Sequence, residues 1–458
     1  MDAQFPMLAG LLLIGVTILG WERFWVLKQK VFTLFFLHGL FVLTFPMYLA
    51  HLVADHDWNA LDFQFDRDSY WRVVYLMIIG YLGILAAQET LRKFPYKERP
   101  PSKLTSYVTT RLNNCNIPLV IFLSFILYAA SLAVTYKTGV GVTGYIAKPD
   151  IGLIYGFMTR IDRTLIPLVN LFIFDRLLEK KDKKMLGLFF IVVVVETGLM
   201  ILVSLSRYAL ISYVLLPALM IWLYQRNQKT AMSPLKMTGL MIVLVIVVSL
   251  GVAIADIARK VVFFSLITGQ GYQAIVPTEN LEWNGLMSAQ LLNGITFYER
   301  LSGAREFIWV DTAIGASGSF MDTFYSVVMG PPDNDPNYIV MRVLGFIEEV
   351  NDDTGFGTGL NLMANFRFGG EEFVIFFGMM AITLFFIYVE RVVRRITPYD
   401  SIILYFVSIV VINMWQGDAL NSVFRRPIQM CVIGVVFLVI IGAMSKKPSP
   451  NTARVCVT

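Results

Sequence analysis

The sequence is poor in charge, and poorer still in the side chains that most often carry enzyme chemistry. Only 16% of its 458 residues are charged, whereas a soluble domain carries about 25%. It has three histidines and three cysteines, and Cys115, Cys431 and Cys456 sit in or beside apolar segments. They therefore predict neither a metal site nor a redox motif. The sequence contains no Walker, Rossmann or metalloprotease pattern, so it does not indicate nucleotide or zinc-protease chemistry.

Apolar residues are abundant where charged residues are few. They account for 56% of the chain, 35 residues are Phe, and the mean hydropathy is +0.64. A helix that crosses about 30 Å of hydrocarbon needs about 17–25 residues. No basic region precedes the first apolar run, so we expect no cleaved signal peptide. Eleven runs qualify as spans: 4–21, 31–52, 72–91, 115–136, 157–177, 185–205, 208–225, 237–257, 372–390, 401–417 and 427–444.

The basic residues predict how these spans are oriented. Most Lys and Arg fall in alternate connections, and Glu179-Lys180-Lys181-Asp182-Lys183-Lys184 is the densest such run. Positive residues stay on the cytoplasmic side of a membrane. The N-terminus is therefore expected outside and the C-terminus in the cytoplasm. The net charge of +5 follows from this sorting and does not indicate a nucleic-acid partner.

These patterns predict an all-α, polytopic membrane bundle of about 11 transmembrane helices with one large outer loop. We expect residues 1–258 to hold the first eight spans and residues 372–458 to hold the last three and a cytoplasmic tail. Residues 259–371 form the loop, which we expect to be mostly helical because residues 286–310 have apolar positions at helical spacing. The lipid bilayer is thus the first predicted partner.

Arginine and lysine sort differently on the two sides. The outer side has many Arg but only Lys137, Lys148 and Lys260, whereas the inner connections contain both types. Arg binds phosphate or carboxylate with a planar fork of donors, so an outer excess of Arg indicates anion recognition. Ion pairing with the outer acids is the alternative.

Six of these arginines lie close to the predicted hydrocarbon, where a charge is costly and often functional. They could converge on one pocket in the outer leaflet, and the pyrophosphate of a polyprenyl lipid would satisfy such a pocket. Snorkelling to lipid phosphates is the alternative for each one. The candidates are Arg160, Arg163, Arg207, Arg259, Arg425 and Arg426.

Acidic residues give three further hypotheses. Glu196 lies in mid-span and indicates either a proton or ion relay or a hydrogen bond between helices. Asp162 is expected to pair with Arg163 near an interface. Asp55-His56-Asp57 and Asp66-Arg67-Asp68 spell short acidic motifs, but solvated loop acids explain them better than a metal. We therefore expect no metal and no cofactor.

The densest charged motif of the large loop runs from Tyr298 to Glu306. It contains Glu299, Arg300 and Arg305, which we take as the candidate catalytic residues. A carboxylate there could deprotonate a sugar hydroxyl while an arginine neutralises a departing phosphate. Local Glu–Arg pairing without catalysis explains the motif equally well.

The chain resembles a known family in its layout and in several short motifs. These are Ser206-Arg207-Tyr208 between two spans, Asp322-Thr323-Phe324-Tyr325 before the proline-rich turn at 331–336, and the glycine-rich return at 355–370. Asp418 and the Arg425-Arg426 pair near the last span complete the set. The family is the O-antigen and exopolysaccharide repeat-unit polymerases (Wzy type), within the group that also includes the O-antigen ligases.

The resemblance implies a GT-C-like glycosyltransferase of the bacterial inner membrane that works on the periplasmic face. It would polymerise undecaprenyl-pyrophosphate-linked oligosaccharide repeat units into a surface polysaccharide, with a flippase and a chain-length regulator as further partners. Arg207, Arg425 and Arg426 match the arginines that such proteins place near the membrane for pyrophosphate. Ligases in the group carry a histidine in the large loop, and this loop has none.

Three other functions remain open from the sequence. A transporter or flippase of the same lipid-linked units would explain Glu196, but it would not need a loop of this length. An O-antigen ligase would transfer the glycan to the lipid A core. A non-catalytic subunit of envelope assembly would show no turnover on its own.

Overall fold

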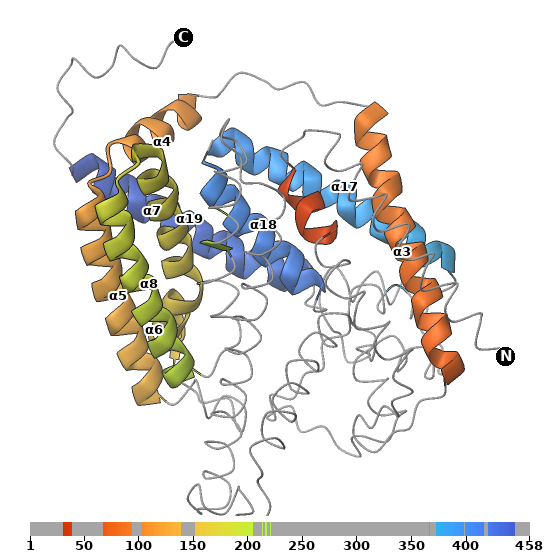
Figure 1. Cartoon of the computed structure of the whole chain (residues 1–458), viewed down its shortest axis with the longest axis horizontal. Coiled ribbons are helices and arrows are strands. Elements are labelled where there is room, and N and C mark those ends of the chain that lie inside the picture. The colour runs from red at the N-terminus through yellow and green to blue at the C-terminus, as the bar shows by residue number, and fades with distance from the viewer. Residues whose placement is uncertain are drawn as a thin grey trace, which may run out of the picture.

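The fold is known from a computed structural model. It describes residues 31–38, 67–93, 103–138, 152–204, 372–397, 399–415 and 420–444, together with the single positions Tyr213, Leu216, Pro217, Met220 and Phe366. Every element in these ranges is a helix, and none of the described residues forms a strand (Figure 1). The all-α part of the expected fold is therefore confirmed for this portion of the chain. The loop 259–371 lies outside it apart from Phe366, so the domain division stays a prediction.

The helices follow the predicted apolar runs closely. Five of them coincide with expected spans: α3 (Arg67–Lys93), α5 (Ile117–Thr138), α8 (Lys183–Ser204), α17 (Glu372–Ile396) and α18 (Asp400–Trp415). The run 31–52 begins with a short helix over residues 32–38. Two helices, Ile117–Lys137 and Glu372–Ile396, are long and apolar enough to cross a membrane, and shorter apolar helices cover Asp400–Ile412 and Cys431–Met444. The runs 4–21 and 237–257 lie outside the described residues.

Two groups of helices meet at α18. On one side α3 packs along α17, and on the other α5, α6 (Gly152–Arg160), α7 (Ile166–Lys180) and α8 pack together (Figure 1). α18 contacts α17, α7 and α19 (Leu420–Met444), and it is buried along residues 401–412. A helix that is apolar and buried all round is the central element of a bundle, so α18 is the centre of the described part.

Glycines set the closest contacts between helices. A Cβ at Gly83 of α3 would collide with the main-chain oxygen of Phe376 in α17. One at Gly442 of α19 would collide with the main-chain oxygen of Arg111 in α4 (Lys103–Asn113). Small residues let helix backbones approach each other without a side chain between them, so these two glycines fix the α3–α17 and α4–α19 distances.

Several helices turn large apolar side chains outward. Phe122 and Phe125 of α5, Phe190 of α8, and Phe373 and Phe377 of α17 are all at least 40% exposed. In water a monomer rarely exposes so many large apolar groups. The outer faces of these helices therefore fit a lipid environment.

The structure differs from the sequence prediction at three elements. The expected connection 92–112 contains the helix α4, whose buried positions Thr105, Val108 and Leu112 follow a helical repeat. The expected span 157–177 is broken into α6, a π-helical segment η2 (Ile161–Leu165) and α7. α19 begins at Leu420 and not at residue 427, so Arg425 and Arg426 lie within the helix.

The run from Glu179 to Lys184 folds into a tight hairpin between α7 and α8. Lys181 adopts a left-handed conformation with φ 54°, and its N–H binds the Leu178 carbonyl while that of Asp182 binds the Leu177 carbonyl. This pattern closes a helix C-terminus. Asp182 Oδ1 then accepts the N–H of Met185 at 3.1 Å and caps the start of α8.

Candidate functional site

The structure describes only part of the predicted site. Glu299, Arg300 and Arg305, the candidate catalytic residues, lie outside the described residues, and so do Arg207 and Arg259. The remaining arginines fall on two helical stretches. Arg160 ends α6 and Arg163 lies in η2, while Arg425 and Arg426 lie near the start of α19.

The two stretches cross. α19 packs against η2 and α7, with Gly434 set against the side chain of Leu168. Arg160 comes eight residues before Leu168, and Arg426 comes eight residues before Gly434. The arginine pairs of both stretches therefore precede the crossing by a similar number of residues.

Both pairs also lie on the same side of that crossing. α7 and α19 run toward one end of the bundle, because Arg176 Nη2 of α7 donates to the Asn113 carbonyl at 3.4 Å and Gly442 of α19 lies against Arg111. Arg160, at the end of α6 before η2 and α7, and Arg426, near the start of α19, therefore lie toward the other end of the bundle. The fold thus brings four of the six predicted arginines onto neighbouring helices on one side of the bundle.

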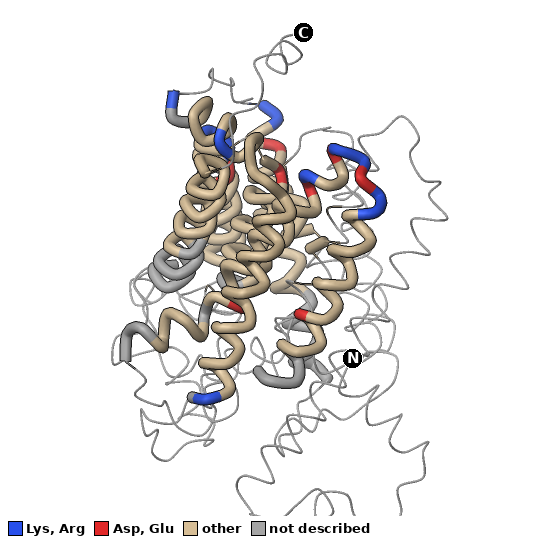
Figure 2. Tube along the Cα trace, turned by 90° about the vertical axis from the view of Figure 1, so that its left-hand side faces the viewer, with Lys and Arg blue, Asp and Glu red and all other residues tan. Residues whose placement is uncertain are grey.

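The end that α7 and α19 run toward is the basic end of the molecule. Hydrogen bonds join its three connections: Tyr399 donates to Asn113 Oδ1 at 2.5 Å, and Ser401 donates to Asp175 Oδ2 at 2.7 Å. Most Lys and Arg of the described residues gather there, at the top of Figure 2. The predicted basic connections that the structure describes, at 92–112 in part, 176–184 and 391–397, therefore lie together, and the others lie outside the described residues.

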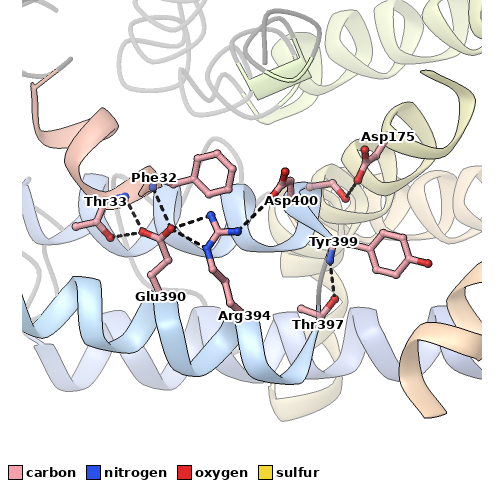
Figure 3. A network of polar contacts seen from close by, with 9 residues as sticks. Phe32, Thr33, Asp175, Glu390, Arg394, Thr397, Tyr399 and Asp400 are labelled. Atoms are coloured by element: carbon pink, nitrogen blue, oxygen red, sulfur yellow. Dashed lines mark hydrogen bonds and ion pairs between the residues drawn. The ribbon is translucent and has the colours of Figure 1, made fainter. Parts of the chain in front are cut away.

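A carboxylate network anchors this basic end, and Figure 3 shows it. Glu390 of α17 accepts the N–H of Phe32 at 3.0 Å and that of Thr33 at 2.9 Å, and it also accepts the Thr33 hydroxyl. Arg394 donates to Glu390 and, at 3.0 Å, to Asp400 at the start of α18. A negative group at a helix N-terminus satisfies its free N–H groups. Glu390 therefore caps the helix 32–38 from a distant part of the chain.

Two further side chains, those of His38 and Tyr399, form hydrogen bonds between segments of the bundle. His38 has its ring nitrogens 2.8 Å from the Tyr81 hydroxyl and from Gln88 Oε1 in α3, so this histidine holds helices together. Burial raises the pKa of the Tyr399 hydroxyl to about 12. Tyr399 therefore binds Asn113 as a neutral donor. These contacts are structural, and none of them forms a reactive site.

The most unusual polar group lies deeper, at η2. A π-helical turn adds a residue to a helix and is frequent at functional sites. Here it turns Asp162 into the bundle, where the side chain is fully buried. Neither carboxylate oxygen has a hydrogen bond of normal geometry, and Nε of the neighbouring Arg163 has none either. The pairing of Asp162 with Arg163 that the sequence predicts is therefore an interaction of neighbouring charges, without a hydrogen bond between the carboxylate and Arg163 Nε.

Glu196 lies in the same interior. It is 0% exposed, and its Oε2 accepts the side-chain N–H of Asn170 in α7 at 2.6 Å. The Tyr128 hydroxyl donates to the main-chain carbonyl of Glu196 at 2.5 Å. The hydrogen bond between helices that the sequence indicated is thus present. Glu196 Oε1 and Asn170 Oδ1 remain without a partner.

Tyrosines enclose this interior, which we call the buried acid cluster and define as Asp162, Asn170 and Glu196. The Tyr213 hydroxyl donates to the Asp162 carbonyl, and the Tyr405 hydroxyl donates to that of Thr164. The described residues contain no group of three His, Cys, Asp or Glu that could hold a metal ion. The cluster therefore offers carboxyl, amide and phenol groups for chemistry.

Sequence reasoning found part of this arrangement. It singled out Glu196 and noticed Asp162, but it missed Asn170 and Glu390. A signal existed for Asn170, because it is a polar residue within a predicted apolar span.

Comparison of the chain with protein-family models, with curated proteins and with solved structures gave no match.

Proposed function

We propose that this chain is a polytopic protein of the bacterial inner membrane that polymerises undecaprenyl-pyrophosphate-linked oligosaccharide repeat units on the periplasmic face. The product is a surface polysaccharide such as an O-antigen, a capsule or an exopolysaccharide. The chain has about 11 transmembrane helices in this proposal, with a periplasmic N-terminus and a cytoplasmic C-terminus. The observation that carries it is the placement of four arginines on two crossing helices, at the end of the bundle away from the basic end.

Membrane embedding is supported by the described surface. The outward aromatic side chains of α5, α8 and α17 fit lipid tails. The gathering of Lys and Arg at one end fits the cytoplasmic side of a membrane protein (Figure 2). The arginines at 160, 163, 425 and 426 then belong to the periplasmic half.

The arginines suit a lipid pyrophosphate for a chemical reason. A guanidinium is always charged and binds two phosphate oxygens at once, and it does so best where water is scarce. Arg163 has a buried Nε without a hydrogen bond, so the described residues leave this donor unused. A donor pyrophosphate in the outer leaflet would supply acceptors.

In the proposed reaction a sugar hydroxyl of one lipid-linked unit attacks the anomeric carbon of the glycan on another. The bond from that carbon to the pyrophosphate oxygen breaks, and undecaprenyl pyrophosphate leaves with the electron pair. Arginines stabilise the charge that develops on this leaving group. A carboxylate takes the hydroxyl proton, and Glu299, beside Arg300 and Arg305, is our candidate for it.

A matched set of arginine variants tests the proposal in cells. We expect Arg160→Ala and Arg426→Ala to abolish long-chain glycan and leave lipid-linked single units, as we also expect of Arg207→Ala. Arg160→Lys should restore little, because an ammonium lacks the planar fork. The control is Arg92→Ala, which removes only a surface pair with Glu89 at 2.8 Å. Chain length is read on gels and protein amount by immunoblot; normal ladders in Arg160→Ala and Arg426→Ala would contradict the proposal.

The second candidate is transport of the same lipid-linked units across the membrane. The buried acid cluster favours it, because carboxyl groups inside a membrane bundle are typical of ion and proton pathways. Purified protein in liposomes with labelled lipid-linked units separates the two functions. A polymerase makes longer products, whereas a transporter moves single units between leaflets and leaves their length unchanged.

A further inference from the structure

The pairing of Glu196 with Asn170 leaves two atoms unexplained. The amide N–H donates to Glu196 Oε2 at 2.6 Å, so the amide and carboxyl groups are in direct contact. The other oxygen on each group, Glu196 Oε1 and Asn170 Oδ1, is buried and has no hydrogen bond. Both are acceptors when the carboxyl is ionised, so neither can satisfy the other. Leaving a buried polar atom unpaired costs about 1–3 kcal/mol.

A single proton would give both of these oxygen atoms a hydrogen bond. A carboxylic acid and a primary amide pair through two hydrogen bonds, in which the amide donates to one carboxyl oxygen and the other carboxyl oxygen donates to the amide carbonyl. The first of these bonds is present. A proton on Glu196 Oε1 completes the second with Asn170 Oδ1 and satisfies both remaining atoms.

The surroundings also favour a neutral carboxyl. The titratable groups that interact with it are Tyr128 of α5 and Tyr213, and these two tyrosines also interact with Asp162 of η2; Tyr213 interacts in addition with Tyr405 of α18. The hydroxyls of all three tyrosines donate to main-chain carbonyls, so their protons are not directed at the Glu196 side chain. No described cation forms an ion pair with Glu196, and an ionised carboxylate buried without one is strongly disfavoured.

We propose that the buried acid cluster is a proton-binding site in which Glu196 carries a proton on Oε1 and donates it to Asn170 Oδ1. Asp162, fully buried with two oxygens that accept no bond of normal geometry, is the nearby acid to which the proton can pass when the helices move. Ca²⁺ or Mg²⁺ fits this site less well than a proton, because these cations take about six or more oxygen ligands. This proposal is compatible with either an enzyme or a transporter. The experiments that test it use no glycan.

The first test compares thermal unfolding of purified full-length variants. Glu196→Gln places an NH₂ group where the proton is proposed, so its Tm at neutral pH should match that of the wild type. Glu196→Ala removes both hydrogen bonds and should lower Tm by several degrees. As pH rises the unfolded wild type releases the Glu196 proton that the folded protein still holds, so the wild type should lose stability, whereas Glu196→Gln should not. The control is Glu179→Gln, at a 49% exposed position, which should leave the pH profile of the wild type unchanged.

The second test is infrared spectroscopy of the protein in lipid nanodiscs. At neutral pH the wild type should show the C=O stretch of a protonated carboxyl, with a shift in D₂O, and Glu196→Gln should lose it. Asp162→Asn should lose any part of this band that comes from the Asp162 carboxyl. Absence of this band in the wild type would overturn the proposal. So would a wild-type Tm that rises with Na⁺, K⁺ or Li⁺ while that of Glu196→Gln does not, since this identifies a metal cation as the ligand.

Discussion

At the scale of single residues, Glu390 and Glu196 show two ways of burying a carboxyl group. Glu390 is 2% exposed and receives two main-chain N–H groups, a hydroxyl and the Arg394 guanidinium. Glu196 is equally buried but receives one amide N–H at its side chain. Buried charges persist when they are paired and hydrogen-bonded. Glu390 therefore suits a structural role, and Glu196 suits the exchange of a proton.

Removing the charge of Glu390 tests the first role. We expect Glu390→Gln to destabilise the protein by about 1–3 kcal/mol, because its amide group would face a main-chain N–H with a donor. Thermal unfolding in detergent measures this. As a matched control, Glu89→Gln weakens the pair with Arg92, whose side chain is 54% exposed, and should cost less than about 1 kcal/mol. An equal Tm loss in both variants would mean that the capping contacts of Glu390 contribute nothing specific.

The sequence showed Glu196 but not the reason for its burial. A carboxylate in a run of valines is visible in any reading of the chain. Its partner Asn170 lies 26 positions away, and only the packing of α7 against α8 brings them together. The capping role of Glu390 could not be predicted for the same reason, since the helix that it caps begins 358 positions earlier in the chain.

At the scale of elements, glycines divide into two classes. Gly83 and Gly442 sit against the backbone of a neighbouring helix, whereas a Cβ at Gly187 of α8 would meet nothing within 4 Å. The first class is required for helix contact. The second only weakens its own helix, by roughly 0.5–1 kcal/mol relative to alanine.

Alanine substitution should therefore have opposite effects in the two classes. Gly83→Ala forces α3 and α17 apart and should destabilise by about 1–3 kcal/mol, the usual range for overpacking. Gly187→Ala should stabilise by about 0.5–1 kcal/mol through helix propensity. Chemical unfolding in mild detergent measures both. A stabilising Gly83→Ala would show that α3 and α17 do not pack as closely as the structure has them.

Element prediction succeeded where apolar runs were long, and it failed where a local break was needed. The spans 115–136 and 372–390 match α5 and α17 to within a few residues at most of their ends, because burial in an apolar phase requires little beyond length. The π turn of η2 carries no composition signal of its own. The start of α19 was placed late because the apolar run begins only after Arg425 and Arg426, whereas the helix extends back to Leu420.

At the scale of the whole molecule, charge sorting gives the proposed orientation. Lys181 forms the hairpin at the basic end, and Lys137 lies at the far end of α5, in its last turn. The proposal places Lys181 in the cytoplasm and Lys137 in the periplasm. Such a difference can be measured because the described native cysteines, Cys115 and Cys431, are buried.

Cysteine labelling in spheroplasts tests this orientation. In a Cys456→Ser background, we expect a membrane-impermeant maleimide to label Lys137→Cys directly, and Lys181→Cys only after permeabilisation. The background itself should remain unlabelled. The opposite pattern would invert the proposed topology, and equal labelling of both from outside would contradict a membrane-crossing α5.

The cap that Glu390 places on the helix 32–38 also has a consequence for biosynthesis. The ribosome adds about 5–20 residues each second, so the 358 positions between Phe32 and Glu390 take roughly 20–70 s to make. During that time the first turn of this helix has free N–H groups and no carboxylate to receive them. A nascent chain halted before α17 would therefore present an unfinished helix end to chaperones and membrane proteases, and completion of translation would conceal it.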